Sequence, residues 1–456
     1  MTGAYTMLLR RFHADWVLPI VSPPLAHGCV TVADDRVVDV GPSATAVPAR
    51  EGDEIQDLQL GRVAIMPGLV NAHTHSVMIL FRGRSEGQSL LTMEGWYNSI
   101  REPELSLVPS DIGPAVALSC AEMALSGTTT FCDQYFFAEE IAEAVKAAGL
   151  RAVIAYGIVQ LGDEVRGVQE LAKARAFLEQ QRSADGRVIP WFGPHAPYVD
   201  NTESLLKAEV EVANEYGAGL HLHMAVGPED NEETEARYGA TATVALERIG
   251  FFEGRVHAAH CLDLSDEDIA VFARAPHASI AYCATAGLRS GREAICPVVP
   301  LRQAGVTVAI GTDNVAANNS YDLIAEMRVA GLVASHREGR AQPISSRELV
   351  RMATIEGARA LGLESEIGSL EAGKAADMIA IDLSSTGYSE TPDFETLLVY
   401  SGSGRDVRHV WVAGEQLVRD RALTRRPYYA IRSDYSTTYA EYWQRVADAK
   451  LNREVA

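Results

Sequence analysis

The sequence predicts an α/β protein in which a (β/α)8 barrel of the TIM type carries a small β-sandwich domain built from both chain ends. Three observations predict this fold class. Short strand-like segments fill the first sixty residues, strand-like and helix-like segments alternate from Met66 to about residue 366, and the chain then returns to strands. A length of 456 residues also exceeds the usual limit for one compact core, which favours a large domain with a smaller one.

Residues 1–66 are expected to form the first part of the β-sandwich. Strand-like runs cover 14–19, 29–32 and 36–41, and turn residues such as Asp34 and Asp35 separate them.

Residues 67–366 are expected to form the barrel. Amphipathic helical stretches cover 139–149, which ends at Gly149, and 202–216, which Gly217 follows. Glycine is the residue that most often follows a helix. Repeated units of this kind over about 300 residues fit a closed barrel better than a doubly wound sheet. The strand-like segments of this region are 128–131, 152–155, 220–223, 256–260, 279–282 and 306–310.

Residues 367–420 are expected to return to the β-sandwich as its second part, with strands at 378–381 and 407–415. The remaining residues, 421–456, are predicted to form a C-terminal helix and tail. The tyrosine-rich row in that segment is more typical of packing than of a binding platform.

Charge and cysteine usage restrict the partners and the compartment. A net charge of −21 argues against nucleic acid and against anionic membranes, because both require a basic surface. A neutral or cationic small-molecule substrate is favoured instead. The six cysteines have no paired spacing, which is typical of buried thiols in a reducing compartment. With no signal-like segment and no window long enough to span a membrane, the sequence predicts a cytoplasmic protein.

Two histidines follow the apolar run at 65–70. His73 and His75 are two residues apart, so on a strand they lie on one face. Two imidazoles held in this way form half of a zinc or iron site.

Further residues of the metal-binding type stand at later strand ends. His223 closes the segment 219–223, with His221 on the same face, His260 closes 256–260, and Asp313 follows the strand at 306–311. Because all strands of a parallel barrel end on one face, these residues are expected to converge there.

Several motifs together resemble the amidohydrolase superfamily. They are PGLVNAHTH at 67–75, GPHAPY at 193–198, AAHC at 258–261, GTDNVAANNS at 311–320 and IGSLEAGKAAD at 367–377. Within the superfamily, the chain looks most similar to the S-adenosylhomocysteine/methylthioadenosine deaminases, with triazine hydrolases as neighbours.

This resemblance implies one divalent metal ion held by His73, His75, His223 and Asp313. Zinc is the default, with iron, manganese or cobalt as alternatives, because nitrogen and oxygen ligands discriminate weakly between them. Such an ion lowers the pKa of a bound water toward ~7. Asp313 would take the proton of that water, and His260 would hydrogen-bond the developing tetrahedral centre. Look-alikes are commonly dimers or tetramers, so a homo-oligomer is expected.

The resemblance also implies three contacts with the substrate. His195 and Glu104 match positions that touch the substrate in adenosine-type deaminases. Tyr156 stands where those enzymes have an arginine, and the segment 283–288 departs from the family pattern as well. Both changes remove polar groups, which favours a less polar substrate than a standard purine nucleoside.

A further departure concerns the catalytic acid. Family deaminases have a glutamate three residues after the third metal histidine, and this chain has Val226 there. Valine cannot transfer a proton. Either Glu229 reaches back through a remodelled loop, or the reaction does not need that proton, or catalysis is impaired.

These observations predict a metal-dependent hydrolase of carbon–nitrogen bonds, acting as a deaminase of a purine-like or related N-heterocycle. One alternative is a hydrolase that displaces chloride, a substituted amine or an amide nitrogen, because chloride leaves without protonation. Another is a binding protein that keeps the metal but has lost turnover.

Overall fold

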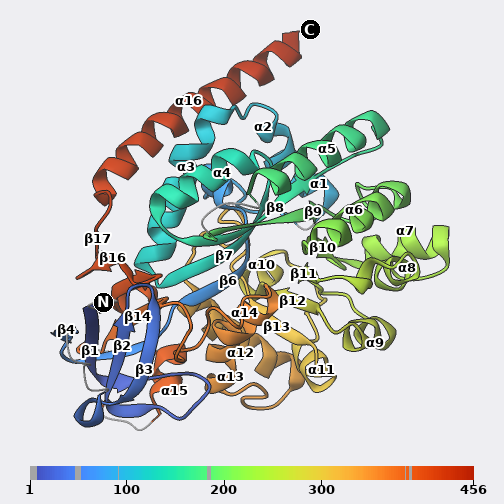
Figure 1. Ribbon diagram of the computed structural model, residues 1–456. Coiled ribbons are helices and arrows are strands. Elements are labelled where there is room, and N and C mark those ends of the chain that lie inside the picture. The colour runs from blue at the N-terminus through green and yellow to red at the C-terminus, as the bar shows by residue number, and fades with distance from the viewer. Residues whose placement is uncertain are drawn as a thin grey trace, which may run out of the picture.

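The computed structural model describes residues 8–46, 53–90, 92–181, 186–385, 387–389 and 393–455; it does not describe the side chains of Met93, Pro228, Glu229 and Glu233 or those beyond residue 452. Figure 1 shows parallel strands surrounded by helices, with a second sheet at one side. The predicted fold class, a (β/α)8 barrel with a β-domain made from both chain ends, is confirmed.

The barrel consists of eight parallel strands in the order in which they occur along the chain. They are β6 (Leu69–Thr74), β7 (Thr128–Tyr135), β8 (Arg151–Ile158), β9 (Val188–Pro194), β10 (Leu220–Met224), β11 (Val256–His260), β12 (Ala278–Tyr282) and β13 (Thr307–Ile310). Nearly every residue of these strands is buried, because helices cover the outside and side chains fill the inside.

Hydrogen bonds close the barrel between its last and first strands. The amide of Asp313 donates to the carbonyl of His73 at 2.9 Å, and Asn71 Nδ2 donates to Thr312 Oγ1 at 2.8 Å. Gly311 lies at this seam, where a Cβ atom would come within 2.8 Å of the His73 nitrogen. The absence of a side chain at Gly311 therefore lets Asp313 approach the strand that carries His73 and His75.

Helices cover the barrel and connect its strands (Figure 1). As predicted, one of them is followed by Gly149 and another by Gly217. The φ angles of these two glycines are 88° and 63°, in the left-handed region that suits glycine. The helices are α1 (Met93–Trp96), α2 (Glu102–Glu104), α3 (Pro109–Leu125), α4 (Ala138–Ala148), α5 (Glu164–Gln181), α6 (Glu203–Tyr216), α7 (Pro228–Tyr238), α8 (Ala242–Arg248), α9 (Asp266–Arg274), α10 (Ala284–Arg289), α11 (Val298–Gln303), α12 (Leu323–Glu338), α13 (Ser346–Met352), α14 (Ile355–Ala360), α15 (Phe394–Tyr400) and α16 (Tyr428–Val455), with short helical turns η1 (Ser43–Thr45), η2 (Ser76–Phe81), η3 (Tyr97–Arg101), η4 (Phe251–Glu253) and η5 (Gly404–Asp406).

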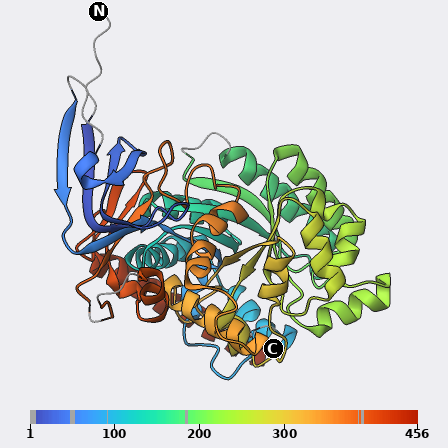
Figure 2. The same cartoon turned by 90° about the horizontal axis from the view of Figure 1, so that it is seen from below.

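The second sheet contains strands from both chain ends, and Figure 2 shows its blue and red strands together beside the barrel. Its strands are hydrogen-bonded in the order β17-β16-β15-β14-β5-β1-β2-β3, and β4 pairs with β1. Their bounds are β1 (Leu8–Val17), β2 (Leu25–Ala33), β3 (Arg36–Pro42), β4 (Glu54–Gln59), β5 (Val63–Pro67), β14 (Met378–Asp382), β15 (Val407–Val412), β16 (Glu415–Arg419) and β17 (Ala422–Leu423). Phe12 and Trp411, from opposite ends of the chain, pack edge to face in its core.

The C-terminal helix α16 packs against the turn that follows His75. Tyr435 Oη donates to the Ile79 carbonyl at 2.8 Å, and Trp443 Nε1 donates to the Leu80 carbonyl at 2.9 Å. No helix in the described part of the chain combines the length and the apolar character that a membrane span requires.

Candidate metal centre and substrate cavity

A chain of hydrogen bonds fixes the tautomer of His73, which lies near the end of β6. His221 Nδ1 lies 2.7 Å from the His257 carbonyl, which can only accept, so this nitrogen carries the proton. His221 Nε2 is then an acceptor, and His73 Nδ1 donates to it at 2.7 Å. The remaining nitrogen, His73 Nε2, is buried and has no hydrogen-bond partner. Its lone pair points to a place where a positive group would satisfy it.

His75 and His223 are fixed in the same way. His75 Nδ1 donates to the Gln134 carbonyl at 2.6 Å, and His223 Nδ1 donates to the His195 carbonyl at 2.9 Å. Their Nε2 atoms therefore carry lone pairs, and they face each other at 3.2 Å. Two acceptors at this distance cannot hydrogen-bond to each other, whereas a cation between them would bind both.

Asp313 supplies a carboxylate to the same place. Its Oδ1 lies 3.4 Å from His73 Nε2 and 3.5 Å from His75 Nε2, and it accepts from the Asn314 amide at 2.6 Å. Three imidazole nitrogens and one carboxylate oxygen form a donor set that suits zinc and related divalent ions. The residues present therefore fit the metal that the sequence predicts.

Burial keeps the histidines in the form that binds metals. Desolvation lowers the pKa of His75 to about 4 and holds the pKa values of His73 and His223 well below their ordinary value. A neutral imidazole offers the lone pair that a metal ligand needs.

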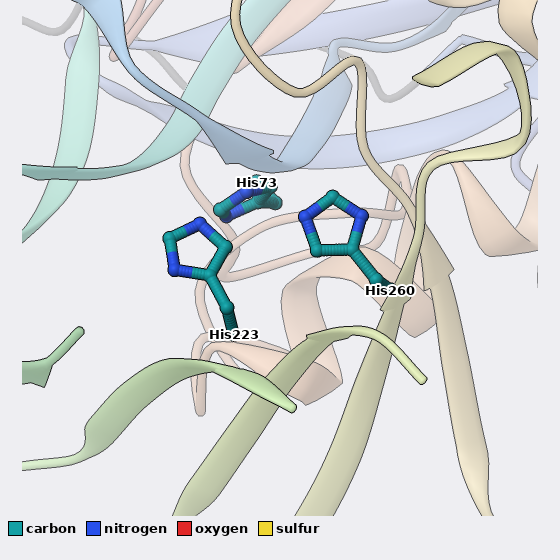
Figure 3. Close-up of side chains that lie close together, drawn as sticks. All are labelled: His73, His223 and His260. Atoms are coloured by element: carbon teal, nitrogen blue, oxygen red, sulfur yellow. The ribbon is translucent and has the colours of Figure 1, made fainter. Parts of the chain in front are cut away.

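His260 completes the cluster from the end of β11. Figure 3 shows His73, His223 and His260 around a common space. The His260 ring stacks on that of His223, with 5.4 Å between the ring centroids, and burial lowers the pKa of His260. Its Nδ1 atom is buried without a hydrogen-bond partner. Candidate ligand atoms of the three histidines lie within 4.8 Å of one another.

The backbone is strained where these strands end. Ala225, His260 and Asp313 have φ angles of 47°, 71° and 58°, in the left-handed region that residues with a Cβ seldom adopt. Such strain costs free energy at each position and is typical of functional sites. It turns the chain sharply at the strand ends that carry the cluster.

A cavity of about 440 Å³ opens over this centre. Its walls combine apolar side chains with a few polar groups, as is usual for small-molecule sites. The apolar residues include Met78, Leu90, Trp96, Ile100, Phe136, Val199 and Val226, and the polar ones include His75, Thr92, Glu104, Gln134, His195, Asp200, His223, Asp230, His260, Arg292, Asp313 and Asn314.

Two of the three predicted substrate residues line this cavity. The His195 ring lies 5.2 Å from that of Trp96, and its Nδ1 is hydrogen-bonded to Asp200 Oδ2 at 2.5 Å. Glu104 is buried; it accepts from Tyr135 Oη at 2.6 Å and lies 3.4 Å from Arg101, and burial raises the pKa of its carboxyl.

The structure corrects the expectation for Tyr156. This side chain leaves β8 on the outer face, where its hydroxyl donates to Glu170 Oε2 on α5 at 3.0 Å. It does not belong to the cavity lining, although the next residue, Gly157, does. Neighbouring residues of a strand point in opposite directions, so Tyr156 faces the helix layer.

The position of the Glu229 side chain lies outside the described part of the structure. Three residues without a role predicted from the sequence lie close to the centre. His221 and His257 support the ligand His73, and Asp230 lines the cavity beside Val226. The alternation of His221 with His223 along β10 was the available signal for His221.

Comparison with known proteins agrees with this geometry. The sequence matches the amidohydrolase family over residues 64–417. The chain belongs to the amidohydrolase family. Members of this family are metal-dependent, so the resemblance inferred from the motifs and the coarse expectation of a metal are both confirmed.

Similar sequences are deaminases by name. This amidohydrolase is 38% identical to a 5-methylthioadenosine/S-adenosylhomocysteine deaminase of Moorella thermoacetica over 403 residues, which are 88% of this chain and 92% of the relative. It is 37% identical to a 5'-deoxyadenosine deaminase of Methanosarcina acetivorans, over 86% of this chain and 88% of the relative. These relatives and the family identify the amidohydrolase as a hydrolytic enzyme that acts on carbon–nitrogen bonds.

Solved structures share the whole architecture. An adenosine deaminase from Xanthomonas campestris with bound zinc superposes with a TM-score of 0.88 at 29% identity, covering 96% of this chain and 99% of the other. Atrazine chlorohydrolase from Arthrobacter aurescens, complexed with zinc, superposes with a TM-score of 0.84 at 25% identity, covering 95% of this chain and 100% of the other.

Proposed function

We propose that this amidohydrolase is a zinc-dependent aminohydrolase that removes an amino group from a purine-like or related N-heterocycle and releases ammonia. One observation carries the proposal. The Nε2 lone pairs of His73, His75 and His223 and the carboxylate of Asp313 converge at the mouth of the barrel, and a cavity of substrate size opens above them. The deaminase names of the similar sequences support the choice of reaction.

The four ligands would hold one divalent ion, which lowers the pKa of a water in its coordination sphere and so makes that water a nucleophile near neutral pH. Asp313 takes the proton of the attacking water and passes it to the departing amine, because its carboxylate lies at the ligand cluster and is also open to the cavity. His260 donates to the oxygen that becomes negative during attack, because its ring faces His73 and His223 and its Nδ1 atom has no other hydrogen-bond partner.

The substrate ring is held by the cavity walls. We infer that it stacks near Trp96 and His195, two aromatic rings that lie 5.2 Å apart and both line the cavity. Asp200 holds Nδ1 of His195, so the other ring nitrogen is oriented for the substrate. Glu104 accepts a hydrogen bond from a polar group of the substrate. Apolar neighbours such as Ile100 and Phe136 favour a substrate with few polar substituents.

A second candidate function is hydrolysis with another leaving group, such as chloride, a substituted amine or an amide nitrogen. Val226 favours it, because this side chain cannot protonate a ring and chloride needs no proton to depart. The overall likeness to atrazine chlorohydrolase is consistent with it. A metal-retaining protein without turnover is the third alternative.

Metal analysis and a substrate panel test the proposal. We expect one zinc ion per chain in the purified protein, and ammonia release from at least one of adenosine, 5'-deoxyadenosine, 5-methylthioadenosine, S-adenosylhomocysteine, guanine, a pterin or an amino-triazine. Chloride release from a chloro-triazine without any ammonia release would favour the second function. Bound metal with no turnover of any compound would favour the third.

Three further properties belong to the same proposal. We propose a cytoplasmic enzyme, supported by six cysteines that are all unpaired and buried. We propose a homo-oligomer, a dimer or a tetramer. Light scattering of the protein as it elutes from a size-exclusion column measures its molar mass and tests this. We also propose that residues 1–66 and 367–420 form one domain beside the barrel of residues 67–366, with 421–456 as an appended helix.

A further inference from the structure

Asp230 brings a carboxyl group to the place where the sequence lacks a catalytic acid. Val226 occupies the position of the family glutamate and lines the cavity. Asp230 is the third residue of α7 and lines the same cavity, together with His223, His260 and Asp313. His223, His260 and Asp313 have roles in the proposed reaction, whereas Asp230 and Val226 have none so far.

A hydrogen bond ties Asp230 to the backbone at Val226. Its Oδ2 atom accepts from the Val226 amide at 2.8 Å. The first turn of α7 therefore folds back on the strand end, and the carboxyl lies beside the backbone amide of the residue whose side chain would otherwise bear the acid. A carboxyl four residues later in sequence thus reaches the same wall of the cavity.

The surrounding contacts hold this turn in place. Thr234 Oγ1 is almost fully buried and donates to the Asp230 carbonyl at 2.7 Å, and Asn231 Nδ2 donates to the Asp263 carbonyl in the loop after β11 at 3.2 Å. The amide of Leu262 donates to the Ala225 carbonyl at 2.8 Å. The loops that follow β10 and β11 are therefore joined, and the start of α7 is fixed relative to His223 and His260.

We propose that Asp230 is the acid that protonates the substrate's ring nitrogen, in place of the glutamate that Val226 replaces. This inference rests on the aminohydrolase function proposed above. Val226 and Val199 add apolar surface to the same cavity.

The water oxygen forms a bond to the ring carbon while Asp230 gives its proton to the adjacent ring nitrogen and Asp313 takes one proton from the water. The carbon–nitrogen bond to the exocyclic amine then breaks, and the amine leaves as ammonia with the proton from Asp313. The new hydroxyl group returns its proton to Asp230 as the carbonyl forms. The net reaction is amine plus water to carbonyl plus ammonia.

The variant Asp230→Asn tests the role, because an asparagine Oδ1 can still accept from the Val226 amide while the side chain no longer carries an acidic proton. We expect kcat for ammonia release to fall roughly 10²–10⁴-fold, with KM and zinc content little changed. Glu232→Gln is the matched control, since this exposed residue of α7 undergoes the same change of charge. We expect it to behave as the wild type.

Two further variants make the outcome decisive. Adding Val226→Glu to Asp230→Asn is expected to restore ammonia release at least tenfold. Ammonia release by Asp230→Asn within threefold of the wild type, or a comparable loss in Glu229→Gln, would overturn the assignment to Asp230. Failure of the proposed function is distinct, since the wild type itself would then release no ammonia from any compound of the panel.

Discussion

His73 Nδ1 lies 2.7 Å from His221 Nε2, so one histidine of the barrel interior orients another that faces the candidate metal centre. His221 in turn donates a hydrogen bond from Nδ1 to the His257 carbonyl, and this bond determines which nitrogen of His221 is protonated. These three residues form a line of donors and acceptors beneath the centre. It leaves His73 with its lone pair directed at the place where His75, His223 and Asp313 meet.

Replacing His221 therefore weakens metal binding without removing a ligand. In His221→Phe, His73 Nδ1 loses its acceptor, and we expect zinc affinity to fall roughly 10–100-fold, the usual effect of losing such a support. Competition with a chelator of known affinity measures it. His277→Phe makes the same change at an exposed site and is expected to have no effect. Equal affinities in the two variants would contradict the role of His221.

Asp313→Asn removes the proton acceptor while it keeps the size of the side chain. We expect turnover to fall roughly 10²–10⁴-fold, because an amide cannot take the proton of the attacking water. Steady-state kinetics on a substrate found in the panel, with zinc content measured on the same sample, separate this loss from loss of metal. A variant that retained both zinc and full turnover would show that the assigned role is wrong.

Asp133 gives the stability a distinct pH dependence. Its carboxyl is fully buried on β7, where it accepts from the Ser76 amide at 2.8 Å and from the Ser76 hydroxyl, and burial raises its pKa from 3.8 to about 7. Between these pH values the folded protein keeps a proton that the unfolded chain has lost. The free energy of unfolding therefore falls as the pH rises through this window, by up to about 1.4 kcal/mol per pH unit, and levels off above it.

Urea denaturation at several pH values, on wild type and Asp133→Asn, measures this contribution. We expect the wild type to lose stability relative to the variant between pH 5 and pH 7, because asparagine does not titrate. Asp448→Asn, at an exposed position of α16, should follow the wild type throughout. Parallel curves for wild type and Asp133→Asn would refute the assignment.

The C-terminal helix stabilises the segment that follows His75. In Trp443→Ala, the hydrogen bond to the Leu80 carbonyl and the packing of the Arg84 guanidinium on the indole, 3.9 Å from the ring centroid, are both lost. We expect a destabilisation of about 3 kcal/mol, seen as a lower Tm, together with weaker zinc retention. Tyr429→Ala is the control, because this side chain is 77% exposed and its loss should change stability by about 0.5 kcal/mol or less.

The alternation of side chains along strands and the position of residues at strand ends make much of the fold predictable. The two faces of a strand and the common open end of a parallel barrel were enough to expect His73, His75, His223 and Asp313 near one another, which is where they lie. The terminal glycines of α4 and α6 were also readable, because glycine suits the left-handed conformation that ends a helix.

Other features could not be read from the sequence. Strand β8 is buried on both faces, so its nearly continuous apolar run does not tell which side chains point inward. The sequence therefore predicts Tyr156 at the cavity, although this side chain faces α5. The path of the chain after β10 depends on the positive φ angle of Ala225 and on the hydrogen bond between Val226 and Asp230. Neither leaves a periodic signal, so the sequence offers Glu229 as a substitute acid and does not indicate Asp230.

The union of both chain ends in one sheet has a consequence for biosynthesis. Strand β5 runs into β6 with only Gly68 between them, and its neighbour β14 belongs to a much later part of the chain. The ribosome thus finishes every predicted zinc ligand, from His73 to Asp313, before it has made β14, whereas the other strand that pairs with β5, β1, is made first. Only the sheet beside the barrel, and not the set of metal ligands, therefore waits for the last part of the chain to be synthesised.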